Sequence, residues 1–243
     1  MINRVLNKVK EHWKFKKEAH LKPEEMAIIR GIKAKNLTYL SNGKLATIVN
    51  AINSANELNT KGLFVEAGCA LGGSSILISK LKYKQASLLV FDVFGMIPEP
   101  TKEDTDDVHE RYQTIAEGKS TGLGGDLYYG YEDNLYDKVL NNFKSFDVYP
   151  EKENVQLIKG LVQETMNISE PVVFAHIDVD WYEPVMTCLE QIWPNLVVGG
   201  NLILDDYHDW GGCRKATDEF FKNLDGQYAM DDNFGSMCVT RIR

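Results

Sequence analysis

Residues 66–75 read Glu-Ala-Gly-Cys-Ala-Leu-Gly-Gly-Ser-Ser, and they lie between the apolar runs 63–65 and 76–78. An apolar run, a glycine-rich turn and a second apolar run predict a strand followed by a helix. Glycine lets the backbone pass close to a ligand, and the first N–H groups of the helix, near Ser74, favour a carboxylate or phosphate. The stretch predicts the opening of a nucleotide-type α/β domain, although a tight turn without a ligand has the same pattern.

The glycine spacing narrows the choice of ligand. A dinucleotide fingerprint needs G-x-G-x-x-G, and Ala70 stands at its second glycine. The chain has instead an acid, Glu66, followed by Gly68 and Gly72. An acid at a strand end suits a ligand with an ammonium group better than a pyrophosphate. The pattern resembles the first motif of class I methyltransferases, which bind S-adenosylmethionine (SAM), and it disfavours an NAD-dependent oxidoreductase.

Composition sets the broad class. The chain has 243 residues, 44% of them hydrophobic, which is enough for one α/β domain with additions. Its net charge of −8 argues against non-specific nucleic-acid binding, which depends on Lys and Arg. The four cysteines include no C-x-x-C pair, so we expect reduced thiols in a cytoplasmic protein and no zinc site. No stretch approaches the ~20 apolar residues of a transmembrane helix, and no secretory signal is recognisable.

We expect an N-terminal helical extension at 1–60 and the main domain at 61–243. In the first seventeen residues, apolar positions recur at helical spacing among lysines. This pattern predicts a helix packed on its own domain or on the partner in a homodimer, with adhesion to an anionic membrane surface as the alternative. Residues 23–59 are also predicted to be helical, with a break at Asn42-Gly43 before an apolar stripe.

From residue 63 onward, strand-like and helix-like segments alternate. The expected strands are 63–66, 87–92, 154–159, 172–178 and 201–205. The expected helices are near 74–82, 132–146, 183–193 and 212–223. This alternation predicts an α/β fold with a doubly wound, mainly parallel, Rossmann-like sheet, which binds ligands at the carboxyl ends of its strands.

The segment 97–131 interrupts the alternation. It is rich in Pro, Gly, Asp and Tyr, has no sustained period, and follows the second strand on the side where a ligand is expected. It holds His109, Arg111 and the tyrosines at 112, 128, 129 and 131. Long loops in compact domains are usually functional or disordered. We therefore expect a substrate lid, with an idle surface insertion as the alternative.

Polar residues follow the expected strands. Asp92 ends the second strand, where an acid can accept both hydroxyls of a ribose. Gly160 lies in the loop after the third strand, which is expected beside the adenine. Helix capping and turn chemistry are the alternative explanations for both residues.

Two acidic pairs follow successive strands. Asp178 and Asp180 end the fourth strand, and Asp205 and Asp206 end the fifth. Neighbouring strand ends would crowd four carboxylates into one cleft, which is unfavourable without a cation. Oxygen ligands suit a hard divalent ion, Mg²⁺ or Ca²⁺, so we expect a metal site. Solvated loop acids and helix caps are the alternative.

Aromatic and histidine side chains accompany these acids. Tyr182 and His208 are candidates for contact with a substrate, while ordinary packing and a surface position are the alternatives. Trp181 and Trp210 are candidates for the pocket wall on the same terms. His176, a lone strand histidine, is expected to be a hydrogen-bonded interior residue.

Five stretches of the chain carry a family resemblance. They are VEAGCALGGSS (65–75), FDVFGMIPEP (91–100), LIKGLVQETM (157–166), HIDVDWYEPV (176–185) and GGNLILDDYHDWGGCRKATDEFF (199–221). In these stretches the chain resembles the macrocin O-methyltransferase (TylF-like) family over about residues 37–221. The chain departs from the family where Cys69-Ala70-Leu71 replaces a Trp-Arg pair, and where Val93 replaces a serine.

The resemblance implies a metal-dependent O-methyltransferase that moves a methyl group from SAM to a hydroxyl of a small molecule, a sugar or glycosylated natural product. It implies that Asp180 is the general base and that Mg²⁺ or Ca²⁺ is held by Asp178, Asp205 and Asp206. SAM is expected to contact Glu66, Gly68, Ser74, Asp92, Gly160 and Asp178. The alternatives are a phenol or catechol acceptor, an NAD-dependent oxidoreductase, and a SAM- or nucleotide-binding module without catalysis.

Overall fold

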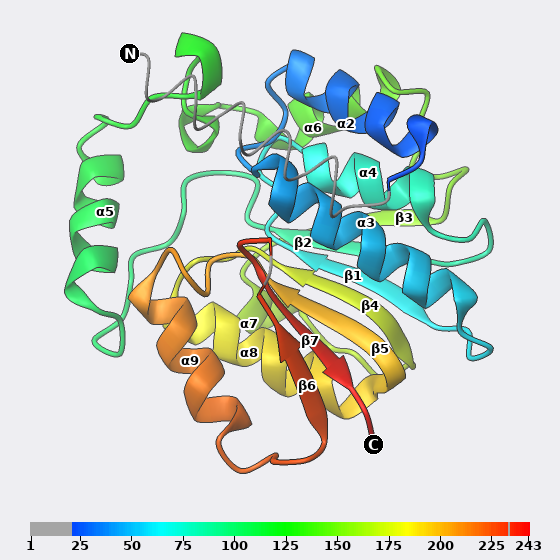
Figure 1. Cartoon of the computed structure of the whole chain (residues 1–243). Helices are drawn as coiled ribbons and strands as arrows, with labels where there is room; N and C mark the ends of the chain where they lie inside the picture. Colours follow the sequence, from blue (N-terminus) through cyan, green and yellow to red (C-terminus); the bar gives the residue numbers. More distant parts are fainter. Residues whose placement is uncertain (1–20, 233) are drawn as a thin grey trace, which may run out of the picture.

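The computed structural model describes residues 21–232 and 234–243, and helices cover both faces of a central sheet (Figure 1). The basic helix predicted in the first seventeen residues lies outside the described residues. None of the described helices is long and apolar enough to cross a membrane.

Seven strands form one sheet, in the order β3-β2-β1-β4-β5-β7-β6. Their bounds are β1 Leu63–Ala67, β2 Leu88–Asp92, β3 Val155–Lys159, β4 Val172–Ile177, β5 Leu196–Leu204, β6 Tyr228–Asp231 and β7 Met237–Arg241. The first five strands are parallel to one another, so the predicted doubly wound, mainly parallel sheet is confirmed. The chain order reverses between β1 and β4, and such a switch point opens a crevice at the carboxyl ends of the strands.

The sequence prediction missed the last two strands. β7 runs antiparallel to β5, and β6 runs antiparallel to β7 at the edge of the sheet. β6 is four residues long and mostly exposed, so it has no apolar run to indicate a strand. β5 also begins at Leu196, earlier than expected, and Gly199-Gly200 lies inside it. These glycines resemble a loop because strands rarely contain them.

One helical layer contains α2 (Pro23–Ala34), α3 (Asn42–Glu57), α4 (Gly73–Leu81) and α6 (Leu135–Lys144). α3 packs on α4 and on strands β4 and β5. The predicted break before the apolar stripe lies at residues 35–41, slightly earlier than expected, because α3 already begins at Asn42. The Ser41 hydroxyl caps the helix by accepting the Lys44 backbone N–H at 3.2 Å.

The opposite layer contains α7 (Val162–Thr165), α8 (Tyr182–Ile192) and α9 (Gly211–Phe221), and the short helix η3 (Trp193–Asn195) follows α8. Each layer closes its own hydrophobic core. Phe64 of β1 packs into the core under α3 and α4, whereas Val65 packs into the core under α8 and α9. Successive side chains of a strand point to opposite faces, so β1 serves both cores.

The segment predicted as a lid contains a regular helix, α5 (Asp106–Ala116), and two short turns, η1 (Leu123–Gly125) and η2 (Tyr129–Tyr131). α5 lies beside α9 at the edge of the molecule (Figure 1). The Asp104 carboxylate accepts the Tyr182 N–H at 2.7 Å, and Asp107 accepts the Gly211 N–H at 3.0 Å. These are the first residues of α8 and α9, so two acids of the segment cap the helices that follow the acidic loops.

Candidate active site

The turn after β1 packs tightly against the end of β4. Gly68 has φ +82°, and a Cβ on this residue would overlap the carbonyl oxygen of Asp178. The Asp178 N–H donates to the Ala67 carbonyl at 2.8 Å, and the Gly68 N–H donates to Phe91 at 2.8 Å. Only glycine combines this backbone angle with so close an approach. Gly68 therefore brings the acidic end of β4 next to the glycine turn.

Asp92 organises the same turn from β2. Its carboxylate accepts the N–H groups of Cys69 at 2.7 Å, Ala70 at 3.2 Å and Phe94 at 2.6 Å. Burial raises the pKa of Asp92, and these backbone donors oppose the rise. The carboxylate borders both cavities described below, so it lies where a ribose contact was predicted.

Glu66 lies deeper than predicted. It is fully buried and borders neither cavity. One carboxylate oxygen accepts the Ser75 hydroxyl, and the other lies 3.0 Å from His176 Nδ1. Glu66 thus orients the start of α4 and the neighbouring strand, and a direct SAM contact stays a prediction. His176 is the interior, hydrogen-bonded histidine that the sequence indicated.

Two cavities lie at the carboxyl ends of the parallel strands. The narrow cavity holds about 90 Å³, and Phe91, Gly160 and Leu161 are part of its lining. The wide cavity holds about 400 Å³, and Ser74 and the acidic residues after β5 are part of its lining. The two share a border formed by Gly68, Asp92, Ile97, Tyr129, Asp178, Asp180 and Trp181. The predicted residues Gly68, Ser74, Asp92, Gly160 and Asp178 therefore line one continuous site.

The two acidic pairs meet, as expected from the parallel strands. Asp178, Asp205 and Asp206 each place a carboxylate oxygen within 4.8 Å of the others. We call these three residues and Asp180 the acid cluster. Asp205 Oδ1 accepts the Ser236 hydroxyl at 2.8 Å. Asp206 Oδ2 is buried and has no hydrogen-bond partner among the described residues.

The electrostatics of the acid cluster fit a hard cation. Burial and the charge of Asp205 raise the pKa of Asp178 well above its usual range. Burial and the charge of Asp180 do the same to Asp206. Without a cation, the protein holds protons on these carboxyls because adjacent buried charges repel. The unpaired oxygen of Asp206 and an all-oxygen donor set are what Mg²⁺ or Ca²⁺ requires.

Asp180 differs from the other three acids in its backbone conformation. It borders both cavities, as Asp178 does, and it has φ +58°, an uncommon angle for a residue with a side chain. Burial and the neighbouring Asp205 raise its pKa to about 6, while the charge of Arg111 opposes the rise. A carboxylate with that pKa is ionised at neutral pH and basic enough to accept a proton. Asp180 can therefore accept a proton from a group in either cavity.

Lys44 is a site residue that the sequence analysis missed. Its ammonium lies 2.7 Å from Asp205 Oδ2 and 2.5 Å from Asp209 Oδ2. These carboxylates hold the pKa of Lys44 above its usual range, although burial opposes the rise. The sequence contained one weak signal: Lys44 lies in the first turn of α3, where the helix dipole disfavours a cation.

Three tyrosines, Tyr39, Tyr128 and Tyr129, line part of the wide cavity, and we call them the tyrosine wall. The ring centroids of Tyr39 and Tyr129 are 5.9 Å apart, and those of Tyr128 and Tyr129 are 4.5 Å apart. The Arg111 guanidinium lies 5.7 Å from the Tyr128 ring centroid. Burial raises the pKa of Tyr128 to about 12, so its hydroxyl stays protonated and can donate.

The two predicted substrate contacts lie outside the cavity lining. Tyr182 donates its hydroxyl to Glu219 at 2.6 Å, and His208 Nε2 lies 3.5 Å from Asp232. Neither residue borders the two cavities, so their contact with a substrate stays a prediction. Trp181 and Trp210 do border the wide cavity, and their rings are 6.1 Å apart.

A parallel sheet with a glycine turn at the switch point and two antiparallel strands at its far edge is the fold of class I methyltransferases. The structure is similar to that of the O-methyltransferase NovP, with a TM-score of 0.71 and 21% identity, covering 85% of this chain and 83% of that chain. It is also similar to the SAH-bound methyltransferase PaMTH1 of Podospora anserina, with a TM-score of 0.57 and 15% identity, covering 99% and 96%.

Sequence comparison identifies the family. The model of the macrocin-O-methyltransferase (TylF) family matches residues 4–236, so the chain belongs to this family. It is accordingly a SAM-dependent O-methyltransferase. A curated relative, the demethyldecarbamoylnovobiocin O-methyltransferase of Streptomyces niveus, is 24% identical over 193 residues. The matched segment covers 75% of this chain and 66% of that enzyme.

Proposed function

We propose that the protein transfers the methyl group of SAM to a hydroxyl of a small molecule, with a divalent cation in the acid cluster and Asp180 as general base. One observation supports this most directly. Asp180 borders the glycine-turn cavity and the cavity of the acid cluster at once. A base in that position can reach a hydroxyl placed between a methyl donor and a cation.

Several residues are placed to bind SAM. Gly160 and Phe91 line the narrow cavity, which suits the adenine. Asp92 has about one acceptor site left after its three backbone contacts and borders both cavities, which suits a ribose hydroxyl. Ser74, at the start of α4, offers donors to the methionine carboxylate. Asp178 lies on the shared border, which supports its proposed contact with the ammonium group.

Asp178, Asp205 and Asp206 would hold the cation. A bound Mg²⁺ or Ca²⁺ would lower the pKa of a coordinated hydroxyl and fix its orientation. Lys44 keeps Asp205 in place from the outer side, and Ser236 does so from the other. Two partners on one carboxylate fix its direction, as second-shell contacts do in metal sites.

Asp180 accepts the proton of the acceptor hydroxyl as the new carbon–oxygen bond forms and the carbon–sulfur bond breaks. The proton moves to a carboxylate oxygen, so the charge of the sulfonium and that of Asp180 are both neutralised. Alignment of the two reacting atoms contributes several kcal/mol in well-oriented reactions, about 7–11 at most. Trp181 supports this alignment, because its indole N–H donates to the Pro98 carbonyl at 3.0 Å and fixes the ring at the border.

The acceptor is proposed to be a sugar hydroxyl of a natural product. Membership in a family named for macrocin, and similarity to an enzyme named for a novobiocin precursor, support this class. A phenol or catechol is the second candidate, because the tyrosine wall offers aromatic contacts and vicinal oxygens suit a carboxylate-held cation. The scattered cysteines support a cytoplasmic location. We also propose that the protein forms a homodimer, which light scattering would test.

Titration calorimetry tests the proposal. SAM and, as a control, NADH are titrated into metal-stripped protein with and without Mg²⁺ or Ca²⁺. We expect SAM to bind, NADH not to bind, and one of the two cations to raise the melting temperature. Methyl transfer is then followed with sugar and catechol acceptors. If neither cation affects melting or transfer, the metal part of the proposal is wrong.

A further inference from the structure

We propose that Arg111 is the binding group for an anionic substituent, a carboxylate or phosphate, on the methyl acceptor. This inference rests on the proposed function, because it names the chemistry of the acceptor in the same site. Arg111 lies on α5 and lines the wide cavity together with the tyrosine wall, and its guanidinium forms no ion pair with a described acid.

Acids greatly outnumber cations in the lining of the two cavities. The acids that line them are Asp92, Glu99, Asp104, Asp178, Asp180, Glu183, Asp205, Asp206 and Asp209. Among the described residues, the cations that line them are Lys44 and Arg111. Lys44 is held by Asp205 and Asp209. Arg111 acts on Asp180 through its charge but makes no ion pair with a described acid, so its N–H groups are open to a ligand.

Most N–H donors of the Arg111 guanidinium are unused by described residues. A guanidinium has five N–H donors in a planar fork that matches a carboxylate or phosphate. Arg111 uses Nη1 on the Ser120 hydroxyl at 2.9 Å, and it has no other hydrogen bond within the described part of the chain. Contact with the Tyr128 ring holds the plane of the fork from one side. The guanidinium is half-buried, its orientation is fixed, and most of its N–H donors have no acceptor among the described residues. These are the properties of an anion-binding site.

The carboxylate of SAM is the other anion that could reach the wide cavity. That group has its own donors at the start of α4, where Ser74 lines the cavity. Arg111 comes from a different element and is grouped with Tyr39 and Tyr128, whose pKa values it lowers through its charge. Tyrosine faces pack against sugar and aromatic rings. The position therefore favours the acceptor, with its ring on the tyrosine wall and its anion on Arg111.

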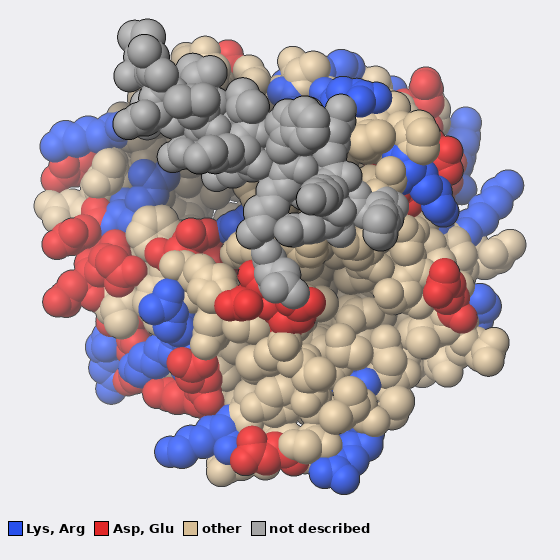
Figure 2. Space-filling model, in the orientation of Figure 1, with Lys and Arg blue, Asp and Glu red and all other residues tan. Residues whose placement is uncertain are grey.

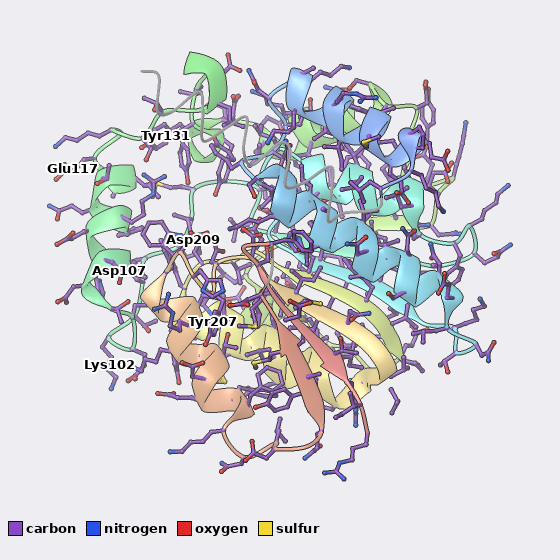
Figure 3. The ribbon with its side chains drawn as sticks, viewed as in Figure 1. Lys102, Asp107, Glu117, Tyr131, Tyr207 and Asp209 are labelled. Carbon is purple, nitrogen blue, oxygen red and sulfur yellow. The ribbon has the colours of Figure 1, made fainter. Side chains whose placement is uncertain are left out.

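Matched ligands test the assignment. The first pair is p-nitrophenyl β-glucuronide and p-nitrophenyl β-glucoside, which differ in one carboxylate. The second pair is glucose 1-phosphate and methyl glucoside, which tests phosphate. Each is titrated by calorimetry into protein loaded with Mg²⁺ and S-adenosylhomocysteine. The variants are Arg111→Gln and Arg111→Lys, with Lys102→Gln as the control, because Lys102 is exposed, borders neither cavity and lies at the edge of the molecule (Figure 3).

We expect the wild type to bind at least one anionic ligand about tenfold or more tighter than its neutral partner, as a charge-assisted contact provides. Arg111→Gln should abolish the preference, Arg111→Lys should keep part of it, and Lys102→Gln should leave it unchanged. Equal binding of both partners, or binding of neither pair, overturns the inference. Weaker SAM binding in Arg111→Gln also overturns it, because the arginine then serves the SAM carboxylate. SAM that fails to bind the wild type refutes the proposed function instead.

Discussion

The ammonium of Lys44 lies 2.7 Å from Asp205 Oδ2 and 3.0 Å from the Asp205 carbonyl, although 161 residues separate the two along the chain. Lys215 makes the same pair of contacts with the carbonyl and carboxylate of Glu103, at 2.8 and 3.0 Å, on the exposed surface. The two lysines thus make equivalent contacts, one mostly buried and one exposed. Burial decides which of them stabilises the fold.

Replacement of Lys44 by Met should lower the free energy of unfolding by about 2–4 kcal/mol, because it leaves the buried Asp205 charge uncompensated. The melting temperature of the metal-free protein should fall by about 5–15 °C. Lys215→Met should change it by no more than about 1 kcal/mol, since exposed pairs contribute little. Thermal denaturation of both variants measures this, and equal losses would contradict the role given to burial.

Asp180→Asn should keep SAM binding and lose methyl transfer by about 10²–10⁴-fold, the range of a general base. Asn has the shape of Asp but cannot accept the proton. Single-turnover transfer and SAM titration measure the two effects separately. Glu117→Gln, on the exposed end of α5 (Figure 3), is the matched loss of a carboxylate outside the cavities and should keep turnover. A variant at Asp180 with most of its turnover would assign the proton to another group.

Stability of the metal-free protein should fall as pH rises from about 4 toward 7. Asp180 has a folded pKa of about 6, raised from 3.8. A raised carboxyl pKa means that the folded state binds the proton more tightly, so its contribution is present below pH 3.8 and is lost as pH rises through 6. Asp178 and Asp206, whose pKa values are also raised, extend the loss of stability toward higher pH.

Urea denaturation at several pH values between 4.5 and 7.5 measures this slope. Asp180→Asn should flatten it, because one titrating group is removed. Added Mg²⁺ or Ca²⁺ should also flatten it, since a cation replaces the protons. Stability that rises across this range in metal-free protein would show that the acid cluster is not strained by its own charge.

Asp104→Ala should loosen the lid segment. Asp104 accepts the N–H of Tyr182 and that of Thr101, at 2.7 and 2.9 Å, so its loss leaves the start of α8 uncapped. We expect a cost of about 1–2 kcal/mol and faster trypsin cleavage at Lys102 and Arg111. Asp106→Ala, an exposed acid on α5, serves as the control. Unchanged cleavage in Asp104→Ala would show that other contacts hold the segment.

Figure 2 shows acidic side chains gathered over α5 and α9, interspersed with lysines and arginines. In Figure 3, Asp107 and Glu117 lie toward opposite ends of α5, while Tyr207 and Asp209 lie on the facing loop after β5. Arg111 and Ile115 of α5 line the wide cavity together with Asp205, Asp206 and Asp209 of the acidic loop, so both segments contribute to its wall.

The local sequence pattern was enough to predict the central part of the fold. The run 63–78 had to form strand, turn and helix, because its apolar residues and glycines allow little else. Parallel strands then had to bring Asp178 and Asp205 to one edge, because side chains that follow neighbouring parallel strands meet there. The acid cluster was therefore predictable from the sequence, and the structure confirms that these acids meet.

Tertiary structure alone decided the rest. β6 forms because β7, paired with β5, offers it an open edge, and its own mostly exposed residues contain no apolar run. Lys44 meets Asp205, and Arg111 meets the tyrosine wall, through contacts between elements that the chain separates. The sequence by itself determined the five parallel strands, the glycine turn and the acids, because these follow from local periodicity. Only the tertiary structure brought Lys44 to those acids, because an ion pair between residues far apart in the chain leaves no periodic signal in the sequence.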